Sequence, residues 1–105
     1  NWHVGSKGTI VYQAAKAAIH GLTKGFAREL GEFKIRVNAI VPGWIMTERQ
    51  KKLWVTAEGL KNQYKRQCLP DLIKPMYVAQ MILFLASDDS SMCTSSNYMV
   101  EAGSI

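Results

Sequence analysis

Apolar residues between Ile10 and Gly31 recur every three or four positions, which is the spacing of one face of an α-helix. This apolar face consists of Ala15, Ile19, Leu22, Phe26 and Leu30. A stripe of small residues on nearly the opposite side consists of Ala14, Ala18, Gly21 and Gly25. The two stripes predict a helix that is buried on two sides, with the apolar face on a sheet and the small-residue stripe against another helix. Gly31 is expected to cap the C-terminus of this helix.

The rest of the chain alternates between predicted strands and predicted helices. The strands are expected over 35–41 and 98–100, and the helices over 57–68 and 75–87. Pro42-Gly43 ends the first strand, and Pro75 suits the first turn of the last helix. The apolar face of that last helix consists of Val78, Met81, Ile82 and Leu85. This order is typical of an α/β crossover between two parallel strands. Because two parallel strands cannot form an independent sheet, the pattern predicts the end of a doubly wound fold whose earlier strands are absent.

Length and composition narrow the class of protein. The 105 residues are enough for one small domain. The formal charge is +5, but the basic residues are interspersed with acidic ones, which argues against a nucleic-acid groove. Cys68 and Cys93 fit neither a zinc pattern nor a disulfide framework, so we expect reduced thiols in a cytoplasmic protein without a metal site. The longest apolar run, 78–86, is far short of the roughly 20 residues of a membrane span.

Tyr12 and Lys16 are the first candidates for chemistry. They stand four residues apart near the start of the first predicted helix, which puts them one turn apart on one face. A free tyrosine has a pKa of about 10, too high for a good base at neutral pH. A nearby ammonium group stabilises the phenolate and lowers this pKa, so that the phenol can exchange a proton with a substrate hydroxyl or carbonyl. On its own, the spacing is more typical of a packed tyrosine beside a solvated lysine.

Several motifs follow one another in register from Tyr12 to Gly103. They are Tyr12-Gln13-Ala14-Ala15-Lys16, Gly21-Leu22-Thr23, Ala27-Arg28-Glu29-Leu30-Gly31, Ile35-Arg36-Val37-Asn38-Ala39-Ile40-Val41-Pro42-Gly43, Val78-Ala79 and Phe84-Leu85-Ala86-Ser87-Asp88. Together they resemble the short-chain dehydrogenase/reductase family. The resemblance implies that residues 1–105 are the C-terminal portion of a single NAD(P)-binding Rossmann-type domain, its last two parallel strands with their covering helices. It also implies NAD or NADP as the cofactor.

The resemblance assigns roles to matching positions. Tyr12 matches the catalytic acid/base, and Lys16 matches the lysine that lowers the tyrosine pKa and binds the nicotinamide ribose. The segment that holds the nicotinamide would include Pro42, Gly43, Ile45 and Thr47. Substrate contacts are expected from Trp44 and from Trp54, which belongs to an expected substrate segment over 46–73. Asn38 matches a position expected to be structural, and His20 is expected to be a partly exposed helix residue.

Parts of the family's site have no counterpart in this sequence. The glycine-rich loop, the residue that selects NAD or NADP, and the catalytic serine and asparagine would all lie upstream of Asn1. Because Asn1 is not Met, we expect the start of the gene product to be absent and the 105 residues alone to be inactive. Two smaller departures lie near the other end. Glu101-Ala102-Gly103 stands where the family often has Asp-Gly-Gly, and Cys93-Thr94-Ser95 lacks the usual glycine after threonine.

The segments 66–70 and 84–90 look most like family members that oxidise sugars at the anomeric carbon. An NAD(P)-dependent oxidoreductase acting on a small alcohol or carbonyl compound, with a sugar as the preferred substrate, is therefore the first hypothesis. A 3-oxoacyl reductase-like activity is the runner-up within the family. A non-catalytic remnant that serves only as an assembly module is the alternative from another class. The resemblance also implies a homodimer or homotetramer formed through the small-residue stripe of the first helix, with neither nucleic acid nor membrane as a partner.

Overall fold

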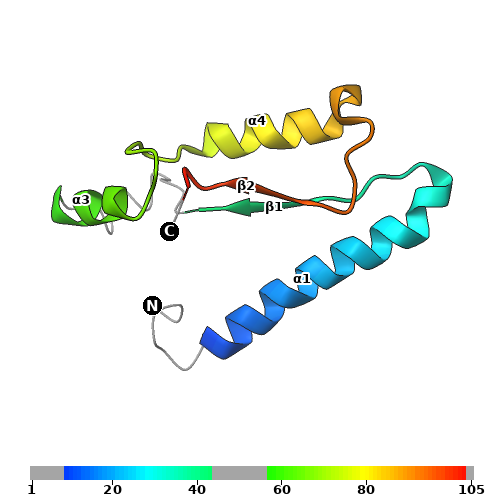
Figure 1. Ribbon diagram of the computed structural model, residues 1–105, viewed down its shortest axis with the longest axis horizontal. Helices are drawn as coiled ribbons and strands as arrows, with labels where there is room; N and C mark the ends of the chain where they lie inside the picture. Colours follow the sequence, from blue (N-terminus) through cyan, green and yellow to red (C-terminus); the bar gives the residue numbers. More distant parts are fainter. Residues whose placement is uncertain (1–8, 44–56, 104–105) are drawn as a thin grey trace. The chain divides into compact units, whose positions relative to one another are not determined.

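The computed structural model describes residues 9–43 and 57–103, apart from the side chains of Thr9, Tyr12 and Ala57. The elements are α1 (Thr9–Leu30), the 3-10 turn η1 (Gly31–Phe33), β1 (Ala39–Pro42), α3 (Ala57–Lys65), α4 (Pro75–Ala86), the 3-10 turn η2 (Asp88–Ser90) and β2 (Asn97–Val100) (Figure 1). The chain divides into two compact units. The first unit holds α1, η1 and residues 92–97, and the second holds α3, α4, η2 and most of both strands.

β1 and β2 pair into a two-stranded sheet. The backbone N–H of Ala39 donates to Ser96 O at 3.0 Å, and that of Gly43 donates to Val100 O at 2.9 Å. Both strands advance by four residues between these two bonds, so the strands are parallel. The α/β class and the crossover between parallel strands are therefore confirmed.

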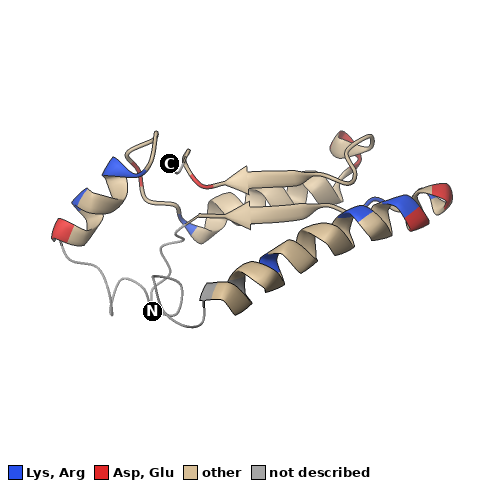
Figure 2. Ribbon diagram, turned by 60° about the horizontal axis from the view of Figure 1, so that its bottom comes forward, with Lys and Arg blue, Asp and Glu red and all other residues tan. Residues whose placement is uncertain are grey.

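α4 follows the sequence pattern closely. It begins at Pro75 in the first helical turn, where the missing N–H of proline costs no hydrogen bond. Within the second unit the helix runs beside the sheet (Figures 1 and 2). Three of the four residues expected on its inner face are half-buried, namely Val78, Met81 and Leu85. The fourth, Ile82, is 52% exposed and lies at the edge of this face.

The predicted strand over 35–41 begins later than expected, at Ala39. The Asn38 side-chain amide donates to Cys93 O at 2.9 Å and accepts from the backbone N–H of Ser96 at 3.3 Å. Before Ala39 the backbone N–H of Ser95 still donates to Val37 O at 2.8 Å, but the side-chain bonds of Asn38 interrupt the regular ladder, so the alternation of apolar and polar residues there does not produce a strand. They also confirm the structural role expected of Asn38. The helix expected over 57–68 likewise ends early, at Lys65.

The predicted cap at Gly31 is wrong. Gly31 begins the 3-10 turn η1, and the left-handed residue that ends the helical segment is Lys34, with φ of 60°. The N–H of Lys34 donates to Gly31 O at 2.9 Å, and the N–H of Ile35 donates to Leu30 O at 3.3 Å. This pair of bonds is the Schellman arrangement, displaced three residues along the chain because η1 continues the winding.

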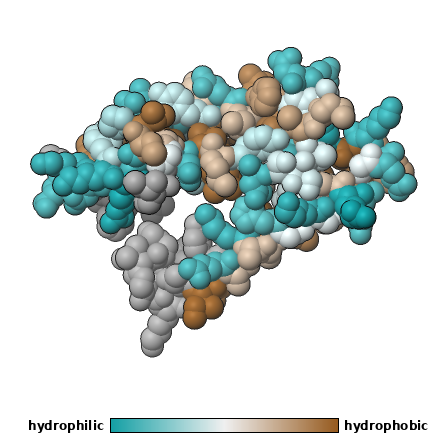
Figure 3. Space-filling view, viewed as in Figure 1, coloured by the Kyte–Doolittle hydropathy of each residue, from teal (hydrophilic) through white to brown (hydrophobic). Residues whose placement is uncertain are grey.

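The two stripes on α1 are largely exposed within the described part of the first unit, where the sequence predicts burial against a sheet and a second helix. Of the apolar face, Ile19 is 56% exposed, Leu22 55% and Phe26 48%. All four residues of the small-residue stripe are exposed. Figure 3 shows hydrophobic surface at the start of α1 and over α4. The described part of this unit holds only the first residue of each strand, so it offers no sheet for the apolar face to cover.

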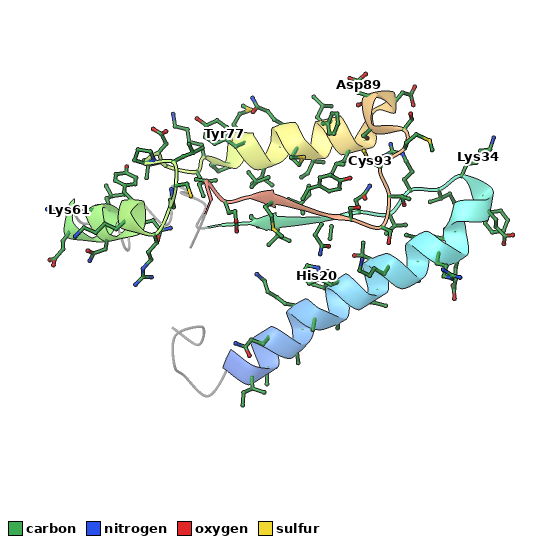
Figure 4. All side chains as sticks on the ribbon, viewed as in Figure 1. His20, Lys34, Lys61, Tyr77, Asp89 and Cys93 are labelled. Carbon is green, nitrogen blue, oxygen red and sulfur yellow. The ribbon has the colours of Figure 1, made fainter. Side chains whose placement is uncertain are left out.

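A third side of α1 packs instead, against residues 95–97. Thr23 and Ala27 are the buried residues of the helix, at 6% and 5% exposed. His20 Nδ1 lies 3.0 Å from Asn97 Oδ1, and Figure 4 shows the imidazole directed away from the helix axis toward that segment. The buried Thr23 hydroxyl donates to Ile19 O at 2.8 Å, which satisfies it within the helix. The partly exposed position expected for His20 is confirmed.

Candidate functional site

α1 carries the two residues expected to perform proton transfer. Tyr12 and Lys16 both belong to this unbroken helix, so their positions share one face one turn apart. The Lys16 side chain is exposed. The Tyr12 side chain lies outside the described residues, so the distance between phenol and ammonium is not defined. Lys16 belongs to the first unit, whereas Pro42 and Gly43 belong to the second.

Gly43 follows β1 at a place where two segments approach too closely for a side chain. A Cβ atom there would lie 2.9 Å from both Cα and Cβ of Glu101 and 3.1 Å from Cδ1 of Ile73, a buried core residue. A substitution would therefore press on the backbone that follows β2. Pro42 is the exposed last residue of β1. The predicted site residues Trp44, Ile45, Thr47 and Trp54 lie outside the described residues.

Residues 101–103 also contact the segment that follows α3. The N–H of Cys68 donates to Gly103 O and the N–H of Leu69 donates to Ala102 O, each at 2.9 Å. Gly103 has φ of +72°, and a Cβ there would lie 2.7 Å from Cβ and 2.8 Å from Sγ of Cys68. Gly103 is thus required both by its left-handed backbone and by the close approach of Cys68.

Gln67 organises the turn between α3 and α4, and the sequence analysis missed its role. The side chain is only 7% exposed. Its Nε2 donates to Leu69 O and to Asp71 O, both at 3.0 Å, and its Oε1 accepts from Gln63 Nε2 at 2.8 Å. The only signal in the sequence is an amide at the end of a predicted helix shortly before Pro70, which is common in turns of many kinds.

The two departures from the family's glycines fall on left-handed backbone. Ser95 has φ of 60° and Ala102 has φ of 54°. A residue with a Cβ in this conformation costs about 1–2 kcal/mol. The left-handed backbone at these two positions gives a physical reason for the glycines that the family often has there.

Residues 9–43 and 57–103 contain no group of three or more His, Cys, Asp or Glu residues that could hold a metal ion. None of the helices in the same ranges is long and apolar enough to cross a membrane. Basic side chains occur at several points of α1 and α3, with acidic ones among them (Figure 2). Cys68 and Cys93 are free thiols, the first exposed and the second half-buried.

Comparison with known proteins decides the family. A family model described as enoyl-(acyl carrier protein) reductase matches residues 2–104. D-xylose 1-dehydrogenase of Caulobacter vibrioides is 48% identical over 103 residues, which are 98% of this chain and 41% of the relative. The chain belongs to the short-chain dehydrogenase/reductase family. The resemblance read from the motifs between Tyr12 and Gly103 is thereby confirmed.

A second relative and a solved structure show which fold class the chain has. A 3-oxoacyl-[acyl-carrier-protein] reductase of Thermotoga maritima is 42% identical over 99 residues, 94% of this chain and 39% of the relative. The solved structure of 4-hydroxyisoleucine dehydrogenase complexed with NADH superposes with a TM-score of 0.81 at 35% identity, covering 88% of this chain and 38% of that one. The Rossmann-type α/β fold class is thus confirmed. The chain spans about two fifths of the length of the curated relatives it matches.

Proposed function

We propose that the protein is an NAD(P)-dependent dehydrogenase that oxidises a sugar at its anomeric carbon. The observation that carries the proposal is the 48% identity, across 98% of this chain, with D-xylose 1-dehydrogenase. Segments 66–70 and 84–90 also resemble those of family members that oxidise sugars, which supports the same substrate class. The chain contributes the proton-transfer pair and part of the nicotinamide segment to such an enzyme.

Tyr12 is the proposed acid/base. In the direction of oxidation, the phenolate accepts the proton of the anomeric hydroxyl while the hydride leaves the same carbon, and a lactone results. Lys16, one helical turn further on, keeps the phenolate in its charged form by electrostatic attraction. The continuous helix α1 supports this role, because it fixes the two positions on one face. The Lys16 side chain lies on the exposed surface of this helix.

The residues present fit a nicotinamide cofactor in part. Lys16 carries three N–H donors on an exposed helix face, which suits the hydroxyls of a ribose. Pro42, Gly43, Ile45 and Thr47 are proposed to hold the nicotinamide, with Trp44 and Trp54 toward the sugar. NADH in the complex of the similar 4-hydroxyisoleucine dehydrogenase supports the choice of cofactor. When bound, the nicotinamide supplies the hydride acceptor.

A 3-oxoacyl reductase-like activity is the second candidate. It is favoured by the 42% identity with the reductase of Thermotoga maritima. The two candidates share Tyr12 and Lys16 and differ in the direction of the reaction and in the substrate. A substrate panel therefore separates them without any variant.

We also propose that copies of the protein associate through the small-residue stripe of α1. A shallow groove of about 440 Å³ follows this helix, lined by Ala18, Gly21, Leu22, Gly25, Phe26 and Glu29. Among the described residues, no atom outside α1 lies within 4 Å of the place that a Cβ would take at Gly21 or at Gly25, so the stripe has room for a second helix. A surface without side chains allows helix axes to approach closely.

The test of the proposed function is the steady-state rate of the full-length protein. D-xylose with NAD or NADP is compared with a 3-oxoacyl thioester and reduced cofactor, by following the absorbance of the reduced nicotinamide. The proposal predicts that kcat/KM for the sugar exceeds kcat/KM for the thioester at least about tenfold. The reverse order would favour the second candidate, and turnover of neither substrate would overturn both.

A further inference from the structure

Residues 101–103 contact two places that lie far apart in the sequence. On one side, Glu101 leaves no room for a side chain at Gly43, at the end of β1. On the other side, Ala102 and Gly103 accept hydrogen bonds from the backbone just after α3. The end of β1 and the residues after α3 are thereby tied to the same short segment. All of these residues belong to the second unit.

α3 itself has little apolar packing to hold it in place. None of its described side chains is fully buried, and Glu58, Lys61, Asn62 and Lys65 are exposed. Its connection to the turn that follows includes the hydrogen bond from Gln63 on the helix to Gln67 Oε1. The buried amide of Gln67 then fixes the turn by donating to Leu69 O and Asp71 O. Leu60 and Tyr64 of α3 are half-buried, and the hydrogen bonds of the Gln67 side chain add to what holds the helix in its orientation. Burial of this side chain strengthens these bonds.

We propose that Gln67 is a positioning residue for the substrate. Through its bonds to Gln63, Leu69 and Asp71 it holds α3 and the turn after it on residues 101–103, beside the end of β1. The inference rests on the proposed function and on the expectation that the segment 46–73, of which the structure describes 57–73, contacts the substrate. Gln67 takes no part in proton transfer, so its loss weakens sugar binding without slowing the chemical step.

The test measures kcat and KM separately in the full-length protein. Gln67→Met keeps the volume of the side chain and removes all of its hydrogen bonds. KM for D-xylose is expected to rise about tenfold, with kcat and the dissociation constant of NADH changed less than about twofold. Gln80→Met is the matched control, because Gln80 is an exposed glutamine on α4, and it is expected to leave all three quantities unchanged.

A second variant covers the case in which Gln67→Met does not fold. Gln63→Met leaves Gln67 in place and removes only the bond from α3, and a smaller rise in KM, about threefold, is expected. A wild-type KM in either folded variant overturns the inference while the proposed function stands. A fall in kcat proportional to the loss of folded protein, at constant KM, also overturns it, because that result marks a purely structural residue. A wild-type enzyme without turnover on the sugar overturns the proposed function and this inference together.

Discussion

Replacing Gly103 by alanine tests the packing of residues 101–103 directly. The alanine would occupy a backbone with φ of +72° and place its Cβ 2.7 Å from Cβ of Cys68. The two residues cannot separate easily, because the N–H of Cys68 donates to Gly103 O at 2.9 Å. Any movement that relieves the overlap lengthens this bond.

The magnitude follows from two contributions. A side chain in the left-handed region costs about 1–2 kcal/mol, and overpacking of a well-packed site costs about 1–3 kcal/mol. Gly103→Ala should therefore lower the free energy of unfolding by about 2–5 kcal/mol.

A change at the neighbouring residue should raise the free energy of unfolding instead. Ala102→Gly relieves a residue at φ of 54° and, after the greater freedom of glycine in the unfolded chain is subtracted, should add about 0.5–1 kcal/mol.

Urea titrations of the full-length protein, all at the same protein concentration, measure the change in the free energy of unfolding for Gly103→Ala and for Ala102→Gly. Cys68→Gly provides the control, because it removes the two atoms that the new Cβ would meet. In a double-mutant cycle, Gly103→Ala combined with Cys68→Gly should recover the overpacking part, about 1–3 kcal/mol, and retain the backbone strain. Gly103→Ala with wild-type stability, or a cycle without coupling, would refute the packing argument.

Two further variants test other parts of the structure. Ser90 is 1% exposed, and its hydroxyl donates to Phe84 O at 2.9 Å at the end of α4, so Ser90→Ala should cost about 1–3 kcal/mol in urea unfolding. Ser91→Ala, at an exposed position, is its control, and an equal effect of the two would contradict this role. Gly25→Leu should lower the mass measured by light scattering from a dimer or tetramer to a monomer, whereas Gln13→Leu, at an exposed position of α1 outside the small-residue stripe, should not. An unchanged mass would count against the stripe as an interface.

The fold elements with a strong period were predictable from the sequence. The apolar positions of α1 and α4 recur at helical spacing, and Pro75 marks where α4 begins. The start of β1 was not predictable from alternation, because Asn38 replaces the ladder with side-chain bonds to Cys93 and Ser96. Such bonds depend on which segment lies opposite, and this is a property of the tertiary structure.

Burial and turn geometry were likewise only partly predictable from the sequence. The spacing of Ile19, Leu22 and Phe26 defines a face but does not say what covers it, and the face is largely exposed here. The departures from the family's glycines at Ser95 and Ala102 were visible in the sequence, but their left-handed backbone is known only from the structure. Gln67 could not be found in this way, because its three partners become neighbours only when the turn has formed.

The candidate site was also predictable only in part. The motifs in register from Tyr12 to Gly103 identified the family, and the continuous helix α1 supplies the one-turn spacing that the proposed chemistry needs. The roles of Trp44, Ile45, Thr47 and Trp54 remain predictions.

The central claim is that Tyr12 transfers the proton while a nicotinamide cofactor takes the hydride. The most direct measurement compares kcat for D-xylose in the full-length wild type, in Tyr12→Phe and in Tyr77→Phe, an exposed tyrosine on α4 that serves as the control. The dissociation constant of NADH is measured for each protein alongside. Tyr12→Phe should lower kcat by a factor of about 10²–10⁴ with NADH binding retained, and Tyr77→Phe should behave like the wild type. A Tyr12→Phe enzyme that turns over the sugar at the wild-type rate would contradict the account.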